Sequence, residues 1–199
     1  MLCVSVKCQE SPENIADDWY FKGSDFNNAG DHINAIKAYD EALKLYPKNT
    51  EYLSAKADSL ISLGRNEEAL DCYNKITESR PQVWSNWKQK AEFLSDMGKY
   101  DEAIKAYDTA IKLNPDNEMI WTDRGEAFVG LGKYEDAIKS FDKAIEIFSN
   151  PLVWSEKGNA LSEWGKYDEA IKAYDKAIEL APDFGIYWIE KGNALATLG

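Results

Sequence analysis

The segment Gly98–Asp108 reads GKYDEAIKAYD, and the same eleven residues return at Gly165–Asp175. A near-copy, GKYEDAIKSFD, begins at Gly132, so successive copies start 34 and then 33 residues apart. Self-similarity at a period of this length indicates supersecondary units that cannot bury their apolar faces alone and must stack on one another. The repeat therefore decides the fold before any local pattern is considered.

Bulky side chains carry the same period along almost the whole chain. They recur at intervals of 34, 34, 34, 33 and 34 residues, at Trp19, Leu53, Trp87, Trp121, Trp154 and Trp188. The period predicts five units and a half unit, at residues 16–49, 50–83, 84–117, 118–150, 151–184 and 185–199. Residues 1–15 precede the first unit, and we expect them to form a short tail.

Each unit contains two helical patterns. If the bulky residue is numbered position 4 of its unit, positions 4, 8 and 11 hold apolar or small residues throughout, which is the i, i+4, i+7 spacing of one helix face. A glycine follows at position 15, where a helix end favours a left-handed residue. Positions 20, 24 and 27 repeat the spacing, with an aromatic residue at position 24, and a proline near position 32 ends this second helix.

This pattern of Trp, Gly, Tyr, Ala, Phe and Pro resembles the tetratricopeptide repeat (TPR) family over residues 16–199. The resemblance implies an all-α fold, a right-handed superhelical solenoid of about five and a half stacked antiparallel helix pairs. It also implies a protein-protein interaction scaffold, in which one face of each first helix lines a concave groove for a peptide or a partner helix. Position 7 departs from the family, since it holds a cation in every unit: Lys22, Lys56, Lys90, Arg124, Lys157 and Lys191.

The expected groove face is acidic from its middle onward. At 100° per residue, positions 2, 5, 6, 9, 12 and 13 lie opposite the apolar face of the first helix. The candidate groove residues at these positions are Tyr20, Phe21, Asp58, Lys88, Glu92, Asp96, Asp123, Glu126, Glu156, Asn159, Glu163, Glu190 and Asn193. We expect a partner peptide with basic and apolar side chains, whose backbone could bond the amides of Asn159 and Asn193. The alternative is that the acids only keep an exposed face soluble.

Composition excludes several other functions. The net charge of -12 and the pI near 4.6 argue against nucleic acid, which is bound largely through Lys and Arg. No stretch approaches the roughly 20 apolar residues that cross a bilayer, so no membrane partner is expected. Three cysteines, Cys3, Cys8 and Cys72, do not form an even disulfide framework, which favours a reducing cytoplasm.

The sequence gives little indication of an enzyme. His32 is the only histidine, and its place in the repeat marks it as a turn residue. Paired acids such as Asp101 and Glu102 recur at the start of second helices, where they suit the helix dipole. No nucleotide-binding or metalloprotease motif is present, so we expect no catalysis, no cofactor and no metal.

The last unit ends after its first helix. Its apolar residues have no second helix to cover them, and these residues are Ile186, Trp188, Leu195 and Leu198. Either the residues come from a longer protein, or the last helix is covered by another chain. A self-assembling scaffold, as a homodimer through the C-terminal half repeat, is therefore the alternative function.

Overall fold

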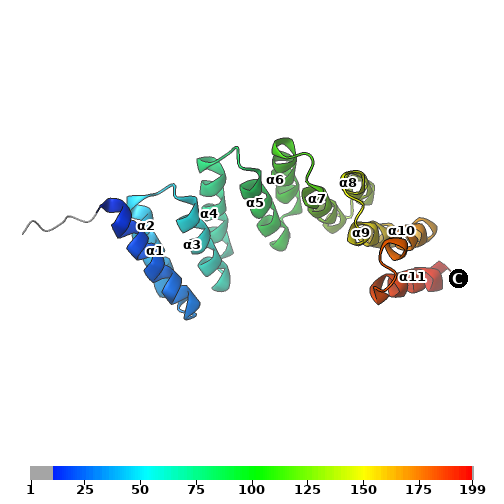
Figure 1. The fold of residues 1–199 in the computed structure, drawn as a ribbon, viewed down its shortest axis with the longest axis horizontal. Coiled ribbons are helices and arrows are strands. Elements are labelled where there is room, and N and C mark those ends of the chain that lie inside the picture. The colour runs from blue at the N-terminus through cyan, green and yellow to red at the C-terminus, as the bar shows by residue number, and fades with distance from the viewer. Residues whose placement is uncertain (1–10, 199) are drawn as a thin grey trace, which may run out of the picture. The chain divides into compact units, whose positions relative to one another are not determined.

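The computed structural model describes residues 11–198, and these residues form eleven α-helices without a strand (Figure 1). The helices follow one another through short loops, and within each of the two compact units each helix packs beside the next, as in helical repeat proteins. The expected all-α helical repeat solenoid is confirmed for this part of the chain. The chain divides after Pro81 into two compact units.

The first unit contains two helix pairs. Its helices are α1 (Pro12–Asn28), α2 (His32–Leu45), α3 (Thr50–Ser62) and α4 (Asn66–Ser79). Helix α1 begins earlier than the repeat pattern, because Pro12 suits the first helical position and the Ser11 side chain accepts a hydrogen bond from the Asn14 amide. Part of the expected tail is therefore helical, whereas its residues 1–10, with Cys3 and Cys8, lie outside the described residues.

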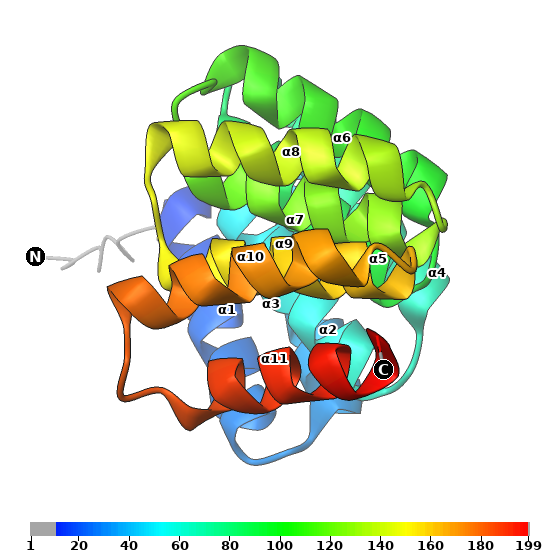
Figure 2. The same ribbon diagram turned by 90° about the vertical axis from the view of Figure 1, so that its right-hand side faces the viewer.

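The second unit contains three helix pairs and one further helix. Its helices are α5 (Trp84–Asp96), α6 (Tyr100–Leu113), α7 (Glu118–Gly130), α8 (Tyr134–Ile147), α9 (Pro151–Glu163), α10 (Tyr167–Leu180) and α11 (Gly185–Leu198). Consecutive helices contact each other, and the odd-numbered helices also contact one another in order, α5 with α7, α7 with α9 and α9 with α11. The odd-numbered helices therefore form one layer, and α6, α8 and α10 form the other (Figures 1 and 2).

The glycine at position 15 ends the first helix of every pair, as the sequence predicts. Its φ is between 69° and 81° at Gly30, Gly64, Gly98, Gly132 and Gly165, which is the left-handed region. The next residue then bonds back to the helix; the Lys99 amide, for example, donates to the Leu94 carbonyl at 2.8 Å. Gly199 lies outside the described residues.

Within a pair, the aromatic residue of the second helix lies against the small residue of the first. At Gly158, an added Cβ would lie 2.5 Å from Cε1 of Tyr174, so the ring occupies the space that a side chain would need. Leu161, one turn later, is 2% exposed, and Tyr174 is also 2% exposed. The predicted face of positions 4, 8 and 11 is therefore the core of each pair.

A second buried stripe runs along the first helices and was missed by the sequence analysis. Positions 3 and 10 face the preceding pair: Tyr187 packs against Ala177 and Ile178, and Ala194 joins the cluster around Ala170. These contacts stack one pair on the next. Each first helix is thus buried on two sides, which leaves a narrower exposed face than an ordinary amphipathic helix has.

The cations at position 7 connect one pair to the next. Lys157 Nζ lies 2.5 Å from Asp142 Oδ1 of the preceding second helix, and 5.3 Å from the ring centroid of Trp154 on its own helix. Equivalent ion pairs join Lys56 to Asp40, Arg124 to Asp108 and Lys191 to Asp175. The stem therefore packs on an aromatic ring while the charge reaches an aspartate at the surface.

Candidate functional site

Two adjoining pockets lie in the second unit and share Glu126. The larger, of about 600 Å³, is lined by Glu92, Ser95, Asp96, Tyr100, Tyr107, Asp123, Glu126 and Ala127. The other, of about 360 Å³, is lined by Glu126, Val129, Phe141, Glu156, Asn159, Ala160, Ser162, Glu163, Tyr174, Glu190 and Asn193. We call these two sets of residues together the acidic groove. Nine of the candidate residues from the sequence line it.

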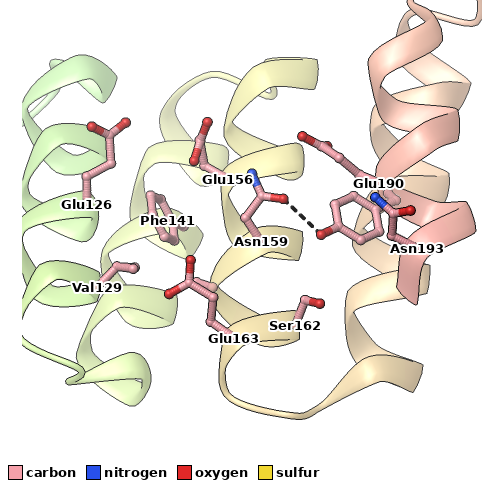
Figure 3. Close-up of a pocket in the computed structure, with 11 residues that line it drawn as sticks. Glu126, Val129, Phe141, Glu156, Asn159, Ser162, Glu163, Glu190 and Asn193 are labelled. Carbon is pink, nitrogen blue, oxygen red and sulfur yellow. Dashed lines mark hydrogen bonds between the residues drawn. The ribbon is translucent and has the colours of Figure 1, made fainter. Parts of the chain in front are cut away.

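The two helix layers make different contributions to the acidic groove. Every carboxylate comes from an odd-numbered helix, whereas Tyr107, Phe141 and Tyr174 come from α6, α8 and α10. Figure 3 shows Glu156, Asn159 and Glu163 on α9, between Glu126 on one side and Glu190 on the other. The described lining of both pockets contains no Lys or Arg. The groove therefore combines acidic side chains with a floor of aromatic rings that are themselves at most 2% exposed.

Lys88 is held beside the groove by two of its acids. Its Nζ lies 2.8 Å from Asp123 Oδ2 and also donates a hydrogen bond to Glu92. Burial favours a lower pKa for Lys88, but the hydrogen bonds to Asp123 and Glu92 outweigh this effect and raise the pKa. Lys88 therefore stays charged and neutralises the negative charge of Asp123 and Glu92. It forms no ion pair with the acids on α9 and α11.

Glu126 is the acid whose ionisation is most perturbed. Burial raises the pKa of its carboxyl to about 7, and the charges of Glu156 and Asp123 add to this effect, while Lys88 opposes it. Burial also raises the pKa of Glu156 and of Asp123. The groove thus holds carboxylates that lack enough cations around them, and a bound cation would stabilise their charged forms.

Hydrogen bonds fix the side chains at the α9 end of the groove. The Tyr174 hydroxyl donates to Asn159 Oδ1 at 2.9 Å, and a hydrogen bond from the Asn159 amide to Glu156 favours the charged form of that acid. Glu190 accepts a hydrogen bond from the Ser155 hydroxyl. Asn159 is therefore already engaged in the free protein, and a peptide backbone would have to compete for its amide.

The remaining candidate groove residues lie in the first unit. The ring of Tyr20 lies within 6 Å of three other rings, with centroid distances of 5.5 Å to Phe21, 5.9 Å to Tyr39 and 5.1 Å to Tyr52. Phe21 is 61% exposed, and burial raises the pKa of Asp58. The first unit therefore presents an aromatic cluster.

The four candidate self-association residues are all exposed. Ile186, Trp188, Leu195 and Leu198 are 51%, 52%, 48% and 49% exposed. Leu161, at the same repeat position as Leu195, is 2% exposed. The outer face of α11 is thus an uncovered copy of a face that is buried in the other pairs.

The aromatic floor of the acidic groove was not among the sequence candidates. The sequence pattern placed an aromatic residue at position 24 of each second helix but did not assign it to the groove, whereas Tyr107, Phe141 and Tyr174 also line the groove. The signal was available, because an aromatic residue recurs at this position in every pair. Ser95 and Ser162, at position 12, also line the groove, but an uncharged hydroxyl in the sequence does not indicate a binding surface as a carboxylate does.

Residues that could suggest catalysis or metal binding have structural surroundings. His32 Nδ1 donates to Asn27 Oδ1 at 2.9 Å where α2 begins. Cys72 is buried, which raises the pKa of its thiol and disfavours the reactive thiolate. Among residues 11–198, no group of three or more His, Cys, Asp or Glu side chains could hold a metal ion. None of the described helices is long and apolar enough to cross a membrane.

Comparison with known proteins identifies the fold family. The helix pairs and their glycine and aromatic positions define an all-α helical repeat protein. Family models described as tetratricopeptide repeat match residues 28–91, 90–150 and 151–184, which together are most of the chain. The chain therefore belongs to the tetratricopeptide repeat family. No curated protein sequence matches it.

Solved structures of similar fold cover most of the chain at low sequence identity. A tetratricopeptide repeat protein from Parabacteroides merdae is 20% identical, with a TM-score of 0.79 over 94% of this chain and 74% of that one. The MamA protein is 24% identical, with a TM-score of 0.72 over 83% and 91%. YrrB, described as a TPR protein with an unusual peptide-binding site, is 16% identical, with a TM-score of 0.71 over 92% and 98%.

Proposed function

We propose that this protein is an interaction scaffold that binds a peptide or helix with basic and apolar side chains in the acidic groove. One observation carries the proposal: carboxylates from four first helices line the groove beside four aromatic side chains, without Lys or Arg in the described lining. A stacked repeat array suits this role, because it offers one long surface for an extended ligand.

The carboxylates favour a basic ligand for an energetic reason. Burial raises the pKa of Glu126 and of Glu156, and the charge of Glu156 adds to the effect on Glu126 while that of Glu190 adds to the effect on Glu156, so the charged forms of Glu126 and Glu156 are disfavoured in the free protein. A Lys or Arg side chain placed among them would remove this repulsion. Arg would also bind a carboxylate through two hydrogen bonds at once, since its planar guanidinium matches carboxylate geometry.

The family and its structural neighbours support a protein or peptide as the ligand. YrrB has a peptide-binding site by its own description. In this chain, the partly exposed side chain of Val129 lies among the acids, so apolar side chains between basic ones would be accommodated. We place the protein in the cytoplasm, where the unpaired Cys72 would remain reduced.

A direct test uses a fluorescein-labelled 12-residue peptide that alternates Arg with Leu, and an isomer in which Glu replaces Arg. We expect only the Arg peptide to bind, more weakly as salt rises because exposed charges are screened. Glu126→Gln combined with Glu156→Gln should weaken binding about tenfold or more, since two acid–cation contacts are lost.

A matched control keeps the number of removed charges constant. Glu146→Gln with Glu179→Gln changes two exposed acids on α8 and α10, each paired locally with a lysine. We expect this variant to bind the Arg peptide like the unchanged protein at equal ionic strength. Equal losses in both double variants would point to net charge alone, and binding of the Glu isomer would refute the proposal.

A further inference from the structure

Lys88 shows how a cation is held at the acidic groove. Its Nζ lies 2.8 Å from Asp123 Oδ2 on α7 and donates a hydrogen bond to Glu92 on its own helix, α5. In the numbering of the repeat, Lys88 is at position 5, Glu92 is at position 9, and Asp123 is at position 6 of the following unit. One ammonium group is therefore bound between two carboxylates from neighbouring first helices.

The same arrangement of acids recurs one unit later, without the lysine. Glu126 is at position 9 of its unit and Glu156 is at position 6 of the next, but position 5 holds Thr122. Thr122 is 8% exposed, and its hydroxyl donates to the Glu118 carbonyl at 2.9 Å. Because Thr122 is uncharged and its hydroxyl is bonded within α7, it supplies no cation to Glu126 and Glu156.

One unit further along, the equivalent positions hold a different set of residues. Ser155 is at position 5, Asn159 is at position 9, and Glu190 is at position 6 of the last unit. The Ser155 hydroxyl donates a hydrogen bond to Glu190, and the Asn159 amide is neutral. These positions thus contain a single carboxylate, which already accepts a hydrogen bond. Between α5 and α11, two acids without a cation at position 5 occur only at Glu126 and Glu156.

Glu126 and Glu156 have room for a further side chain beside them. Both line the same pocket, of about 360 Å³, and Figure 3 shows them on neighbouring first helices, α7 and α9. Within residues 11–198, Glu126 has no hydrogen bond or ion pair, whereas Glu156 accepts a hydrogen bond from Asn159. Burial, with the charge of Glu156, raises the pKa of Glu126 to about 7. A cation between the two acids would therefore be favoured.

We propose that Glu126 and Glu156 bind the ammonium group of a lysine side chain of the ligand, as Glu92 and Asp123 bind that of Lys88. We call these two acids the lysine subsite. The inference rests on the proposed function, because it assigns one contact of the peptide in the acidic groove. A primary ammonium suits the subsite, since it has three N–H donors and can bond two carboxylates at once.

The first test supplies the missing lysine within the protein. Thr122→Lys adds a lysine at position 5, where the Lys88 side chain is accommodated with 16% exposure. The probe is a fluorescein-labelled 12-residue peptide that alternates Lys with Leu, followed by fluorescence anisotropy. We expect Thr122→Lys to weaken its binding about tenfold or more, because the protein's own ammonium fills the lysine subsite. Carbon-13 NMR should also show a lower pKa of Glu126 in this variant.

Thr109→Lys is the matched control for this change. It adds the same charge on α6, at a residue that does not line the acidic groove. It also removes the same kind of hydrogen bond, since the Thr109 hydroxyl donates to the Lys105 carbonyl at 3.0 Å. We expect a loss of affinity of at most about twofold, from the added charge alone. Equal losses in Thr122→Lys and Thr109→Lys would overturn the lysine subsite.

The second test removes the lysine that the groove already contains, and does not depend on whether Thr122→Lys folds. Lys88→Thr and Lys88→Met lose the same charge, but only threonine vacates the space between Glu92 and Asp123, because methionine keeps a long side chain there. We expect Lys88→Thr to bind the Lys peptide about threefold or more tightly than Lys88→Met, since a second pair of acids becomes available. Equal affinities of the two variants would contradict the proposal.

A modified peptide tests the chemistry of the ligand. Trimethylation of every lysine keeps the positive charge but removes the N–H donors, so we expect binding to the unchanged protein to weaken about fivefold or more. Equal affinity of both peptides would refute an ammonium held by hydrogen bonds.

The outcomes for the lysine subsite and for the acidic groove are distinguishable. If the Lys peptide binds and Glu126→Gln with Glu156→Gln weakens it, while Thr122→Lys behaves as Thr109→Lys does, the groove is supported and the lysine subsite is refuted. If neither the Lys peptide nor the Arg peptide binds, both proposals are refuted.

Discussion

Tyr174 lies directly over Gly158 and donates its hydroxyl proton to Asn159, the next residue, at 2.9 Å. One face of the ring therefore packs the pair α9 and α10 together, while its hydroxyl end lies in the acidic groove. Packing inside a pair and the surface offered to a ligand are thus coupled through a single aromatic residue. Predictions about stability and about binding can be separated only by variants that change one of these contacts.

Gly158→Ala and Gly192→Ala form a matched pair that measures the packing of the ring. Both replace a helical glycine within KGNAL, so both gain up to about 1 kcal/mol of helix propensity. Only at Gly158 does the new Cβ meet a ring, and overpacking of a core costs about 1–3 kcal/mol. We expect Gly192→Ala to be the more stable variant by about 1–3 kcal/mol.

Urea unfolding followed by circular dichroism measures this difference. The natural alanines at position 8, Ala57 and Ala91, are both fully buried, so other pairs of the fold accept a methyl group there. The sign of the difference is therefore the important result. Equal stability of the two variants would mean that Tyr174 moves aside without cost.

Local periodicity explains why most of the fold could be predicted from the sequence. The glycine at position 15 adopts a left-handed conformation wherever it is described, and the aromatic and small residues pack as their spacing predicts. These features depend on one or two turns of a single helix. The start of α1 is equally local, since Ser11 and Pro12 form a standard N-terminal capping sequence, but it lies outside the repeat pattern.

Contacts between stacked helix pairs could not be predicted from the sequence in the same way. The cation of Lys157 was identified, but its partner Asp142 lies on another helix, and the pairing follows from the offset between stacked pairs. The burial of Tyr187 arises from the same stacking. The carboxylates of the acidic groove could be predicted, because charged residues indicate an exposed helix face. Its aromatic floor could not, because those rings belong to the second helix layer.

Arg124 should contribute more to stability than an ordinary surface cation. Its Nε donates to Asp108 and its Nη1 donates to the Ser140 hydroxyl, each at 2.8 Å, while the guanidinium lies 4.7 Å from the ring centroid of Phe128. We expect Arg124→Ala to lower the free energy of unfolding by about 1–3 kcal/mol, since hydrogen bonds and stem packing are lost together.

The comparison variant for Arg124 is Lys143→Ala, whose lysine pairs with Glu146 at an exposed site. Exposed pairs contribute about 0–1 kcal/mol, so urea unfolding should show a much smaller change there. Arg124→Lys should recover only part of the loss, because one ammonium cannot bond Asp108 and Ser140 in the same fork. Full recovery by lysine would show that charge alone matters at this position.

Tyr174→Phe separates the two roles of the tyrosine. The ring remains over Gly158, but the hydrogen bond to Asn159 is lost, which should cost about 0.5–1.5 kcal/mol in urea unfolding. Asn159 then has a free carbonyl, so we expect the affinity for the Arg peptide to change while the helical content does not. The control is Tyr134→Phe, outside the groove. An unchanged stability would mean that water replaces the hydroxyl without loss.

Glu126 should make stability and binding depend on pH in opposite directions. The folded-state pKa is about 7, above the ordinary value of 4.5, so the folded chain binds more protons than the unfolded chain between these values. Stability therefore falls as pH rises through this window, and Glu126→Gln should remove this fall. Neighbouring atoms partly desolvate the carboxyl, but the residue as a whole is exposed to solvent, so we expect less than about 1 kcal/mol at pH 8. A basic peptide favours the charged form of Glu126, and its affinity should rise from pH 5.5 to pH 8 as Glu126 ionises. Fluorescence anisotropy across this range checks the prediction, and Glu146→Gln, which should keep the full pH dependence, is the control.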